Sequence, residues 1–129
     1  MSEAISVIVV DDQAPFRMAA RAVIRRSEGF ELVGEAENGL LALELANEVR
    51  PNVVLMDINM PEMGGIEATK RIVEALTNTF IILCSTYEIG DLPPDATTSG
   101  ARAYVNKEKL GAKTLQRLWD RREEVHFAS

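Results

Sequence analysis

Five reactive side chains stand at the ends of four short apolar runs. The runs are Ile5–Val10, Val53–Met56, Phe80–Cys84 and Ala103–Asn106. The first run is followed by the carboxylates of Asp11 and Asp12, and the second by a third carboxylate, Asp57. The other two are followed by the hydroxyl of Ser85 and the ammonium of Lys107. Carboxylates bind divalent cations, and hydroxyl and ammonium groups bind phosphate oxygens, so this set predicts chemistry on a phosphoryl group.

The apolar runs also predict where these side chains meet. Continuous Val, Ile and Leu runs of this length are typical of parallel strands that are covered on both faces. In an open α/β sheet, ligands bind beyond the carboxyl ends of the strands. If the four runs are neighbouring strands, their reactive side chains therefore share one edge of the sheet, as a site for a divalent cation and a phosphoryl group.

Each of these residues could also have a purely structural role. One aspartate shortly before Pro15 could simply cap the following helix, because aspartate is a favoured N-cap. A lysine such as Lys107 is most often just exposed. Ser85 and its neighbour Thr86 are both hydroxyl residues, and their adjacency does not say which one points inward. Capping does not explain a third carboxylate at Asp57, and three like charges brought together are costly without a cation.

Length and composition limit the class of protein. The 129 residues fit a single domain spanning residues 1–129, with a core over about 5–122. The net charge of -6 argues against a protein that binds nucleic acid directly. Cys84 is the single cysteine and is expected to be buried and inert. No apolar stretch approaches the roughly 20 residues of a membrane span, and no signal peptide is apparent, so we expect no membrane association and a cytoplasmic location.

Strand patterns alternate with helical ones, which predicts an α/β fold with a parallel sheet. One further strand is expected at Phe30–Ala36. The last apolar run gives the fifth strand, at Arg102–Val105. Helical patterns occupy about 15–28, 40–49 and 66–76, with a last helix at Leu110–Arg122. The segment Tyr87–Gly100 is the least regular: Pro93 and Pro94 could open a helix, but its Thr and Ser residues favour helices weakly, so a short fourth helix of a turn or two is expected. Residues Glu123–Ser129 are expected to form a frayed tail.

Taken together, these residues resemble the receiver domain of two-component response regulators, over nearly the whole chain. The Asp11-Asp12 pair is similar to the acidic pair of that family. The segment Asp57-Ile58-Asn59-Met60-Pro61, with Gly65 beyond it, is similar to its phosphoacceptor loop. Ser85 rather than Thr86 matches the family's hydroxyl residue by its distance from Lys107. The segment Gly100–Lys107 matches the fifth-strand motif, with Tyr104 in the place of the switch aromatic.

The resemblance implies a doubly wound, flavodoxin-like fold with strand order 2-1-3-4-5. It implies that Asp57 takes a phosphoryl group from a phosphohistidine, and that Lys107 pairs with the bound group. It further implies Mg²⁺, or Mn²⁺, as a cofactor. The implied metal ligands are Asp12, Asp57, the backbone carbonyl of Asn59 and, through water, Asp11.

The same resemblance implies a conformational switch. Ser85 would move to hydrogen-bond the phosphoryl group, and Tyr104 would follow inward. Asn59 and Tyr87 take places that tune the lifetime of the acyl phosphate in the family. We expect the bulky Tyr87 to hinder the attacking water.

The implied partners are a sensor histidine kinase or phosphotransfer protein, and then a downstream target or a second copy of the chain. In the family, the fourth helix, fifth strand and fifth helix form that output face. Two departures affect it here: the Pro93-Pro94 segment, and Glu108 where the family often has a proline. In the family, the peptide bond before that proline is often cis. A cis bond before a residue other than proline costs about 2.5–4 kcal/mol, so a trans Lys107–Glu108 peptide is expected.

Two other classes of protein fit some of these residues. A phosphatase of the haloacid-dehalogenase type also uses a strand-end aspartate, a lysine and Mg²⁺, but it typically carries a second aspartate two positions later, where this chain has Asn59. A phosphorylation-independent interaction domain would not need Asp57, Lys107 and the acidic pair. The expected role is therefore a non-enzymatic phosphoacceptor, either standing alone or as part of a larger regulator.

Overall fold

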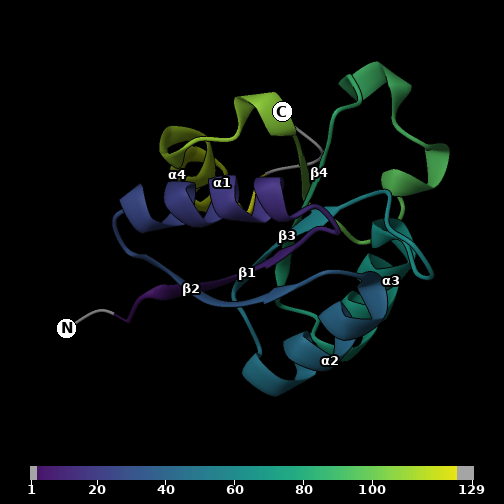
Figure 1. Ribbon diagram of the computed structural model, residues 1–129, viewed down its shortest axis with the longest axis horizontal. Helices are drawn as coiled ribbons and strands as arrows, with labels where there is room; N and C mark the ends of the chain where they lie inside the picture. The colour runs from purple at the N-terminus through teal and green to yellow at the C-terminus, as the bar shows by residue number, and fades with distance from the viewer. Residues whose placement is uncertain (1–2, 125–129) are drawn as a thin grey trace.

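A computed structural model describes residues 3–124 of the chain as a five-stranded parallel sheet flanked by helices (Figure 1). The strands are β1 (Ile5–Val10), β2 (Phe30–Ala36), β3 (Val53–Asp57), β4 (Phe80–Ser85) and β5 (Ala103–Asn106). The α-helices are α1 (Ala14–Arg26), α2 (Gly39–Val49), α3 (Gly65–Ala75) and α4 (Ala112–Asp120). The strand order is β2-β1-β3-β4-β5, which confirms the predicted doubly wound topology.

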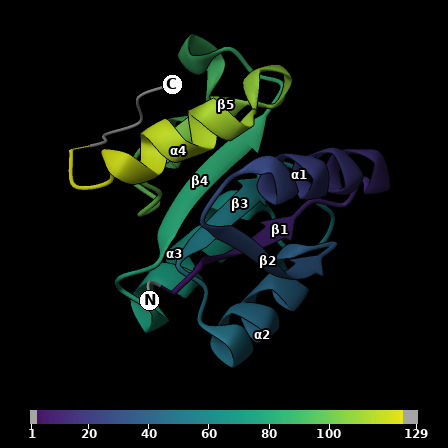
Figure 2. The same ribbon diagram turned by 90° about the vertical axis from the view of Figure 1, so that its left-hand side faces the viewer.

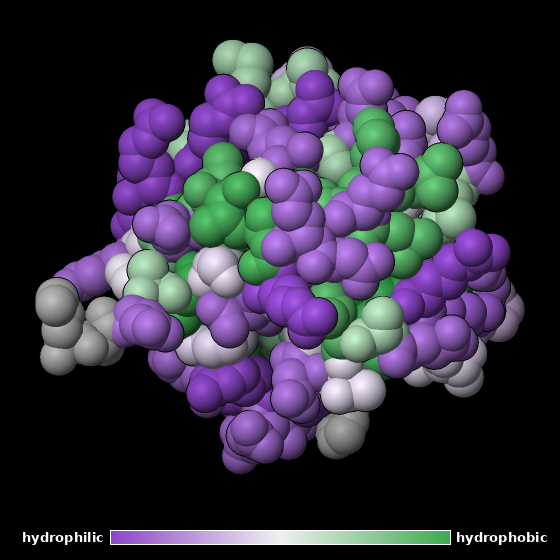
Figure 3. Space-filling model, turned by 90° about the horizontal axis from the view of Figure 1, so that it is seen from below, coloured by the Kyte–Doolittle hydropathy of each residue, from purple (hydrophilic) through white to green (hydrophobic). Residues whose placement is uncertain are grey.

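The helices divide between the two faces of the sheet, so that each face has its own core (Figures 1 and 2). Helices α1 and α4 cover one face, where Ile24 and Leu118 pack on the strands. Helices α2 and α3 cover the other, where Ala46 and Ile72 do so. Figure 3 shows the side of α2 and α3, where apolar side chains emerge among hydrophilic ones. No helix within residues 3–124 is long and apolar enough to cross a membrane.

Burial on both faces explains why the strand sequences read as continuous apolar runs. Along β1, Val7 and Val9 belong to the core under α1 and α4, whereas Ile8 and Val10 belong to the core under α2 and α3. All four side chains are fully buried. Because successive residues point to opposite faces, a strand covered on both sides must be apolar throughout.

Two local features fix the chain around the strand ends. The Asn38 side chain caps α2 by accepting a hydrogen bond from the amide of Leu41 at 2.8 Å, and asparagine is a favoured N-cap. Gly65 begins α3 directly against the end of β3. A Cβ at Gly65 would lie 1.9 Å from the carbonyl oxygen of Asp57, so only glycine permits this approach.

The segment between β4 and β5 is irregular, as predicted, but it does not form a single short helix. It contains two separate 3-10 turns, η1 (Ile89–Asp91) and η2 (Pro94–Ala96). After η2, the hydroxyls of Thr97, Thr98 and Ser99 each donate to the backbone carbonyl three residues earlier. These bonds occupy carbonyl groups that a continuing helix would use, which explains why no α-helix forms.

The boundaries of the last elements also shift slightly. The final strand begins one residue later than predicted. The final helix begins two residues later, after a third 3-10 turn, η3 (Lys107–Lys109). In the predicted tail, Glu123 and Glu124 lie in a turn, and residues 125–129 lie outside the described part of the chain.

Candidate functional site

Three carboxylates meet at the carboxyl ends of β1 and β3. One oxygen each from Asp11, Asp12 and Asp57 lies within 4.8 Å of the others. Asp11 is fully buried and Asp57 is 5% exposed, whereas Asp12 faces solvent. These three oxygens are hard ligands of the type Mg²⁺ prefers, and the exposed Asp12 leaves one side of the cluster open for entry. The acidic rim, as we name these three residues, lies where the sequence predicted it.

Lys107 closes the acidic rim from the side of β5. Its Nζ lies 2.6 Å from Asp11 Oδ2 and 3.2 Å from Asp57 Oδ1, and its side chain is 17% exposed. The ring of Phe16, on the first turn of α1, lies beneath the ammonium with 4.7 Å between Nζ and the ring centroid. Such a contact holds a cation over an aromatic face. Helical spacing places Phe16 on the first helix, and no sequence signal links it to Lys107.

The electrostatics of the rim favour an additional positive charge. Burial, followed by the nearby Asp11 carboxylate, raises the pKa of Asp57 from 3.8 to about 6, although Lys107 opposes this. Burial alone would lower the pKa of Lys107, but Asp11 and Asp57 together outweigh it and raise that pKa. One ammonium thus partly neutralises three carboxylates, and the donor set fits a divalent cation.

Ser85 ends β4 beside the rim, and its hydroxyl is engaged with Tyr104. The Ser85 Oγ and Tyr104 hydroxyl lie 2.8 Å apart, and Ser85 Oγ also accepts a hydrogen bond from the Tyr87 amide at 3.1 Å. The Tyr104 hydroxyl further donates to the backbone carbonyls of Ser85 and Tyr87. Tyr104 is 1% exposed, so its ring is already inside the protein. Burial raises the pKa of its hydroxyl above the usual value.

The two residues expected to tune the acyl-phosphate lifetime contact each other. The amide Nδ2 of Asn59, just after β3, donates to the Tyr87 hydroxyl at 3.2 Å. Asn59 is exposed and Tyr87 is half-buried, so the pair lies on the solvent side of the rim. The Tyr87 side chain therefore reaches toward the loop that follows β3.

The turn after Lys107 has the geometry that its sequence predicts. No cis peptide bond occurs among residues 3–124, so the Lys107–Glu108 bond is trans. The Asn106 side chain accepts a hydrogen bond from the Glu108 amide at 2.9 Å and thereby caps η3. Cys84 is fully buried beside the rim, and burial raises the pKa of its thiol to about 12, which supports an inert role.

The fold and the rim together define a doubly wound α/β protein with an acidic site beyond the strand ends. The model of the response regulator receiver domain family matches residues 7–118, and the chain belongs to this family. It is a phosphoacceptor signalling domain of two-component systems, as its motifs predicted.

The relatives include both single-domain and longer regulators. The chain is 39% identical over 114 residues to the transcriptional regulatory protein YdfI of Bacillus subtilis (strain 168), covering 88% of this chain and 53% of that protein. It is 38% identical over 112 residues to the chemotaxis protein CheY of Thermotoga maritima, covering 87% of this chain and 92% of that protein. The chain thus spans about half the length of YdfI and nearly all of CheY.

Solved structures agree with the family assignment. The crystal structure of a LuxR-family two-component response regulator from Aurantimonas sp. SI85-9A1 matches with a TM-score of 0.86 at 30% sequence identity. The match covers 99% of this chain and 91% of that one. The similarity therefore extends over nearly the whole chain.

Proposed function

We propose that Asp57 is the phosphoacceptor, and that a histidine kinase or phosphotransfer protein supplies the phosphoryl group. A carboxylate oxygen of Asp57 attacks the phosphorus of a phosphohistidine, the P–N bond breaks, and the histidine nitrogen keeps the electron pair and takes up a proton. The product is an acyl phosphate on Asp57. The observation that carries this proposal is the position of Asp57, between two further carboxylates and 3.2 Å from the Lys107 ammonium.

In this proposal, Lys107 changes partners during the reaction. In the structure its ammonium contacts Asp11 and Asp57. Once Asp57 is an acyl phosphate, the ammonium pairs with a phosphoryl oxygen while Asp11 still holds it. Lysine suits this role because its compact charge sits on a flexible stem.

The acidic rim is proposed to hold Mg²⁺, with Mn²⁺ as an alternative. Asp12, Asp57 and the backbone carbonyl of Asn59 would be direct ligands, and Asp11 would act through water. When bound, the cation supplies positive charge opposite the equatorial phosphoryl oxygens. The supporting observation is that carboxylate oxygens of Asp11, Asp12 and Asp57 lie within 4.8 Å of one another, because a cation relieves the repulsion between such charges.

The switch is proposed to start at the Ser85 hydroxyl. Ser85 would leave Tyr104 and donate a hydrogen bond to the phosphoryl group. The resemblance implies that Tyr104 moves inward, but Tyr104 is already buried and two backbone carbonyls accept from its hydroxyl. In this proposal Tyr104 therefore loses its hydrogen bond to Ser85 without moving inward. The outcome is a local rearrangement of the segment that carries Ser85 and Tyr87.

The output face is proposed to lie beside this segment. A groove of about 300 Å³ runs between η1, the end of β5 and α4, and its lining includes Ile89, Tyr104 and Arg117. This groove takes the place of the family's helix-strand-helix output face. A downstream protein or a second copy of the chain would bind there, with no direct contact to nucleic acid and no catalytic turnover by this domain.

Labelling by a small phosphodonor tests the phosphoacceptor role. The parent should take up about one phosphoryl group per chain in Mg²⁺ and none in EDTA. Asp57→Asn should take up none, whereas Asp95→Asn, an exposed aspartate on η2, should behave like the parent. Labelling of Asp57→Asn would refute the proposal. Sustained hydrolysis of a generic phosphate monoester would instead favour the haloacid-dehalogenase reading.

A further inference from the structure

Asp11, at the junction of β1 and α1, makes three hydrogen bonds and one ion pair. Its amide donates to the carbonyl of Ala36 at 3.0 Å, and its Oδ1 accepts from the amide of Gln13 at 2.8 Å. Its Oδ2 contacts Lys107 at 2.6 Å. The remaining group, the backbone carbonyl oxygen, accepts a hydrogen bond of 2.7 Å from Nη1 of Arg17.

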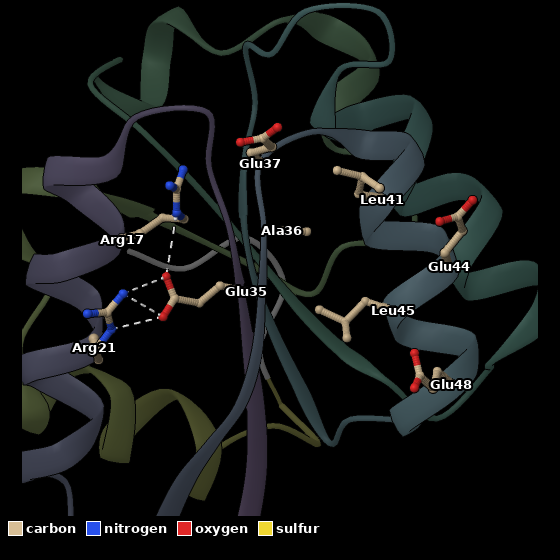
Figure 4. A pocket seen from close by; sticks show the side chains of 9 residues that line it. All are labelled: Arg17, Arg21, Glu35, Ala36, Glu37, Leu41, Glu44, Leu45 and Glu48. Carbon is tan, nitrogen blue, oxygen red and sulfur yellow. Dashed lines mark hydrogen bonds and ion pairs between the residues drawn. The ribbon is translucent and has the colours of Figure 1, made fainter.

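Arg17 is itself anchored from outside the site, as Figure 4 shows. Its Nε lies 3.5 Å from Oε1 of Glu35 on the edge strand β2. Arg21, one turn further along α1, donates two hydrogen bonds to the same carboxylate, of 2.9 and 3.1 Å. Glu35 therefore binds two arginines. Arg17 also reaches the acidic rim, whereas the side-chain hydrogen bonds and ion pairs of Arg21 within residues 3–124 all go to Glu35.

We infer that Arg17, held by Glu35, is a positioning residue for the acidic rim, acting through the backbone carbonyl of Asp11. This inference rests on the proposed function of the rim. The carbonyl belongs to the peptide that joins Asp11 to Asp12, so its orientation sets the direction of both carboxylates. A charged donor makes a stronger hydrogen bond than a neutral one and holds this peptide firmly.

Arg17 and Arg21 form a matched pair for a test. Both lie on α1, both contact Glu35, and replacing either by glutamine makes the net charge more negative by one. Loss of a nearby positive charge by itself tightens the binding of a cation. Loss of positioning weakens it. The two explanations therefore predict opposite signs for Arg17→Gln.

The first measurement is the Mg²⁺ dissociation constant, determined by titrating metal-free protein with MgCl₂ in a calorimeter. Arg17→Gln is expected to bind Mg²⁺ about tenfold more weakly than the parent, the usual size of such an indirect effect on a metal site. Arg21→Gln is expected to bind it as tightly as the parent or slightly more tightly. Arg17→Lys keeps a charged donor but cannot reach Glu35 and the carbonyl at once, and it should fall between the parent and Arg17→Gln.

The second measurement needs no metal. The Gln13 amide donates to Asp11 Oδ1, so its hydrogen exchange reports the orientation of that carboxylate. Exchange of this amide in EDTA should accelerate in Arg17→Gln and stay unchanged in Arg21→Gln. If Arg17→Gln does not fold, the same two measurements compare Arg17→Lys with Arg21→Lys.

Two results would overturn the inference. The first is parent-like or tighter Mg²⁺ binding in Arg17→Gln, with unchanged exchange at Gln13. The second is an equal loss in Arg21→Gln, since the effect would then belong to the ion cluster as a whole. A failure of the phosphoacceptor proposal would be seen in a different experiment, as phosphoryl labelling of Asp57→Asn. The difference in Mg²⁺ binding between Arg17→Gln and Arg21→Gln would then still be observed.

Discussion

At the scale of single residues, the site depends on side chains that share partners. Lys107 binds two carboxylates and lies over Phe16, and Tyr104 binds the Ser85 hydroxyl and two carbonyls. In the proposed mechanism, phosphorylation of Asp57 would disturb both groups at once, because Lys107 and Ser85 would both turn toward the new oxygens. The residues of the proposed switch are thus coupled by direct contacts.

Tyr87 gives a prediction at this scale. Its hydroxyl accepts a hydrogen bond from Asn59, which holds the ring over the loop that follows Asp57. Tyr87→Ala should release phosphate from the acyl phosphate about three- to tenfold faster, which lowers the barrier by about 0.7–1.4 kcal/mol. The rate is measured as loss of label after the phosphodonor is removed.

Tyr87→Phe is the matched control, because it keeps the ring and removes only the hydroxyl. A parent-like rate in Tyr87→Phe would assign the effect to exclusion of water by the ring. If Tyr87→Ala releases phosphate no faster than the parent, Tyr87 does not protect the acyl phosphate.

At the scale of elements, the approach of α3 to β3 fixes the phosphoacceptor loop. Gly65→Ala would place a methyl group 1.9 Å from the Asp57 carbonyl oxygen, so the start of α3 would have to move. We expect a loss of about 2–3 kcal/mol in the free energy of unfolding, typical of forced overpacking, together with slower labelling of Asp57. Urea denaturation measures the first effect.

Gly90→Ala is the control for this prediction. Gly90 lies in η1, has no positive φ, and nothing lies within 4 Å of the position its Cβ would take. Its unfolding free energy should change by no more than about 0.5 kcal/mol. Equal stability of Gly65→Ala and Gly90→Ala would show that α3 adjusts without cost.

The elements also show how far the sequence alone predicts this protein. The four apolar runs predict β1, β3, β4 and β5 because strands buried on both faces leave a continuous pattern. The reactive ends then follow from the rule that parallel strands present their carboxyl ends at one edge. The sequence did not predict contacts that depend on distant side chains: the ring of Phe16 under Lys107, Arg17 on the Asp11 carbonyl, and the burial of Tyr104.

At the scale of the whole molecule, the buried carboxylate of Asp57 lowers the free energy of unfolding at neutral pH. The pKa of Asp57 is raised from 3.8 to about 6, so between these values the folded protein binds more protons than the unfolded chain. Stability must then fall as pH rises through this range, and the full cost is present above about pH 7. After a discount for partial solvent screening, this cost is about 1–2 kcal/mol.

Asp57→Asn should therefore stabilise the metal-free protein by about 1–2 kcal/mol at pH 7.5. At pH 4 it should stabilise the protein by nearly nothing, because Asp57 is then protonated in the folded protein and about half protonated in the unfolded chain. Thermal or urea unfolding in EDTA across this pH range measures the difference. Glu74→Gln, an exposed position on α3 with the same change of charge, should show no such gain.

Mg²⁺ should reverse the order of the two proteins at pH 7.5. A ligand that binds only the folded state stabilises it in proportion to the logarithm of its concentration over its dissociation constant. The parent should therefore gain about 2.7 kcal/mol at a Mg²⁺ concentration 100 times that constant, whereas Asp57→Asn, which lacks one ligand, should gain much less. Equal gains in both proteins would place the cation elsewhere. A pH-independent difference in EDTA would mean that burial and the neighbouring Asp11 carboxylate do not raise the pKa of Asp57 in the folded protein.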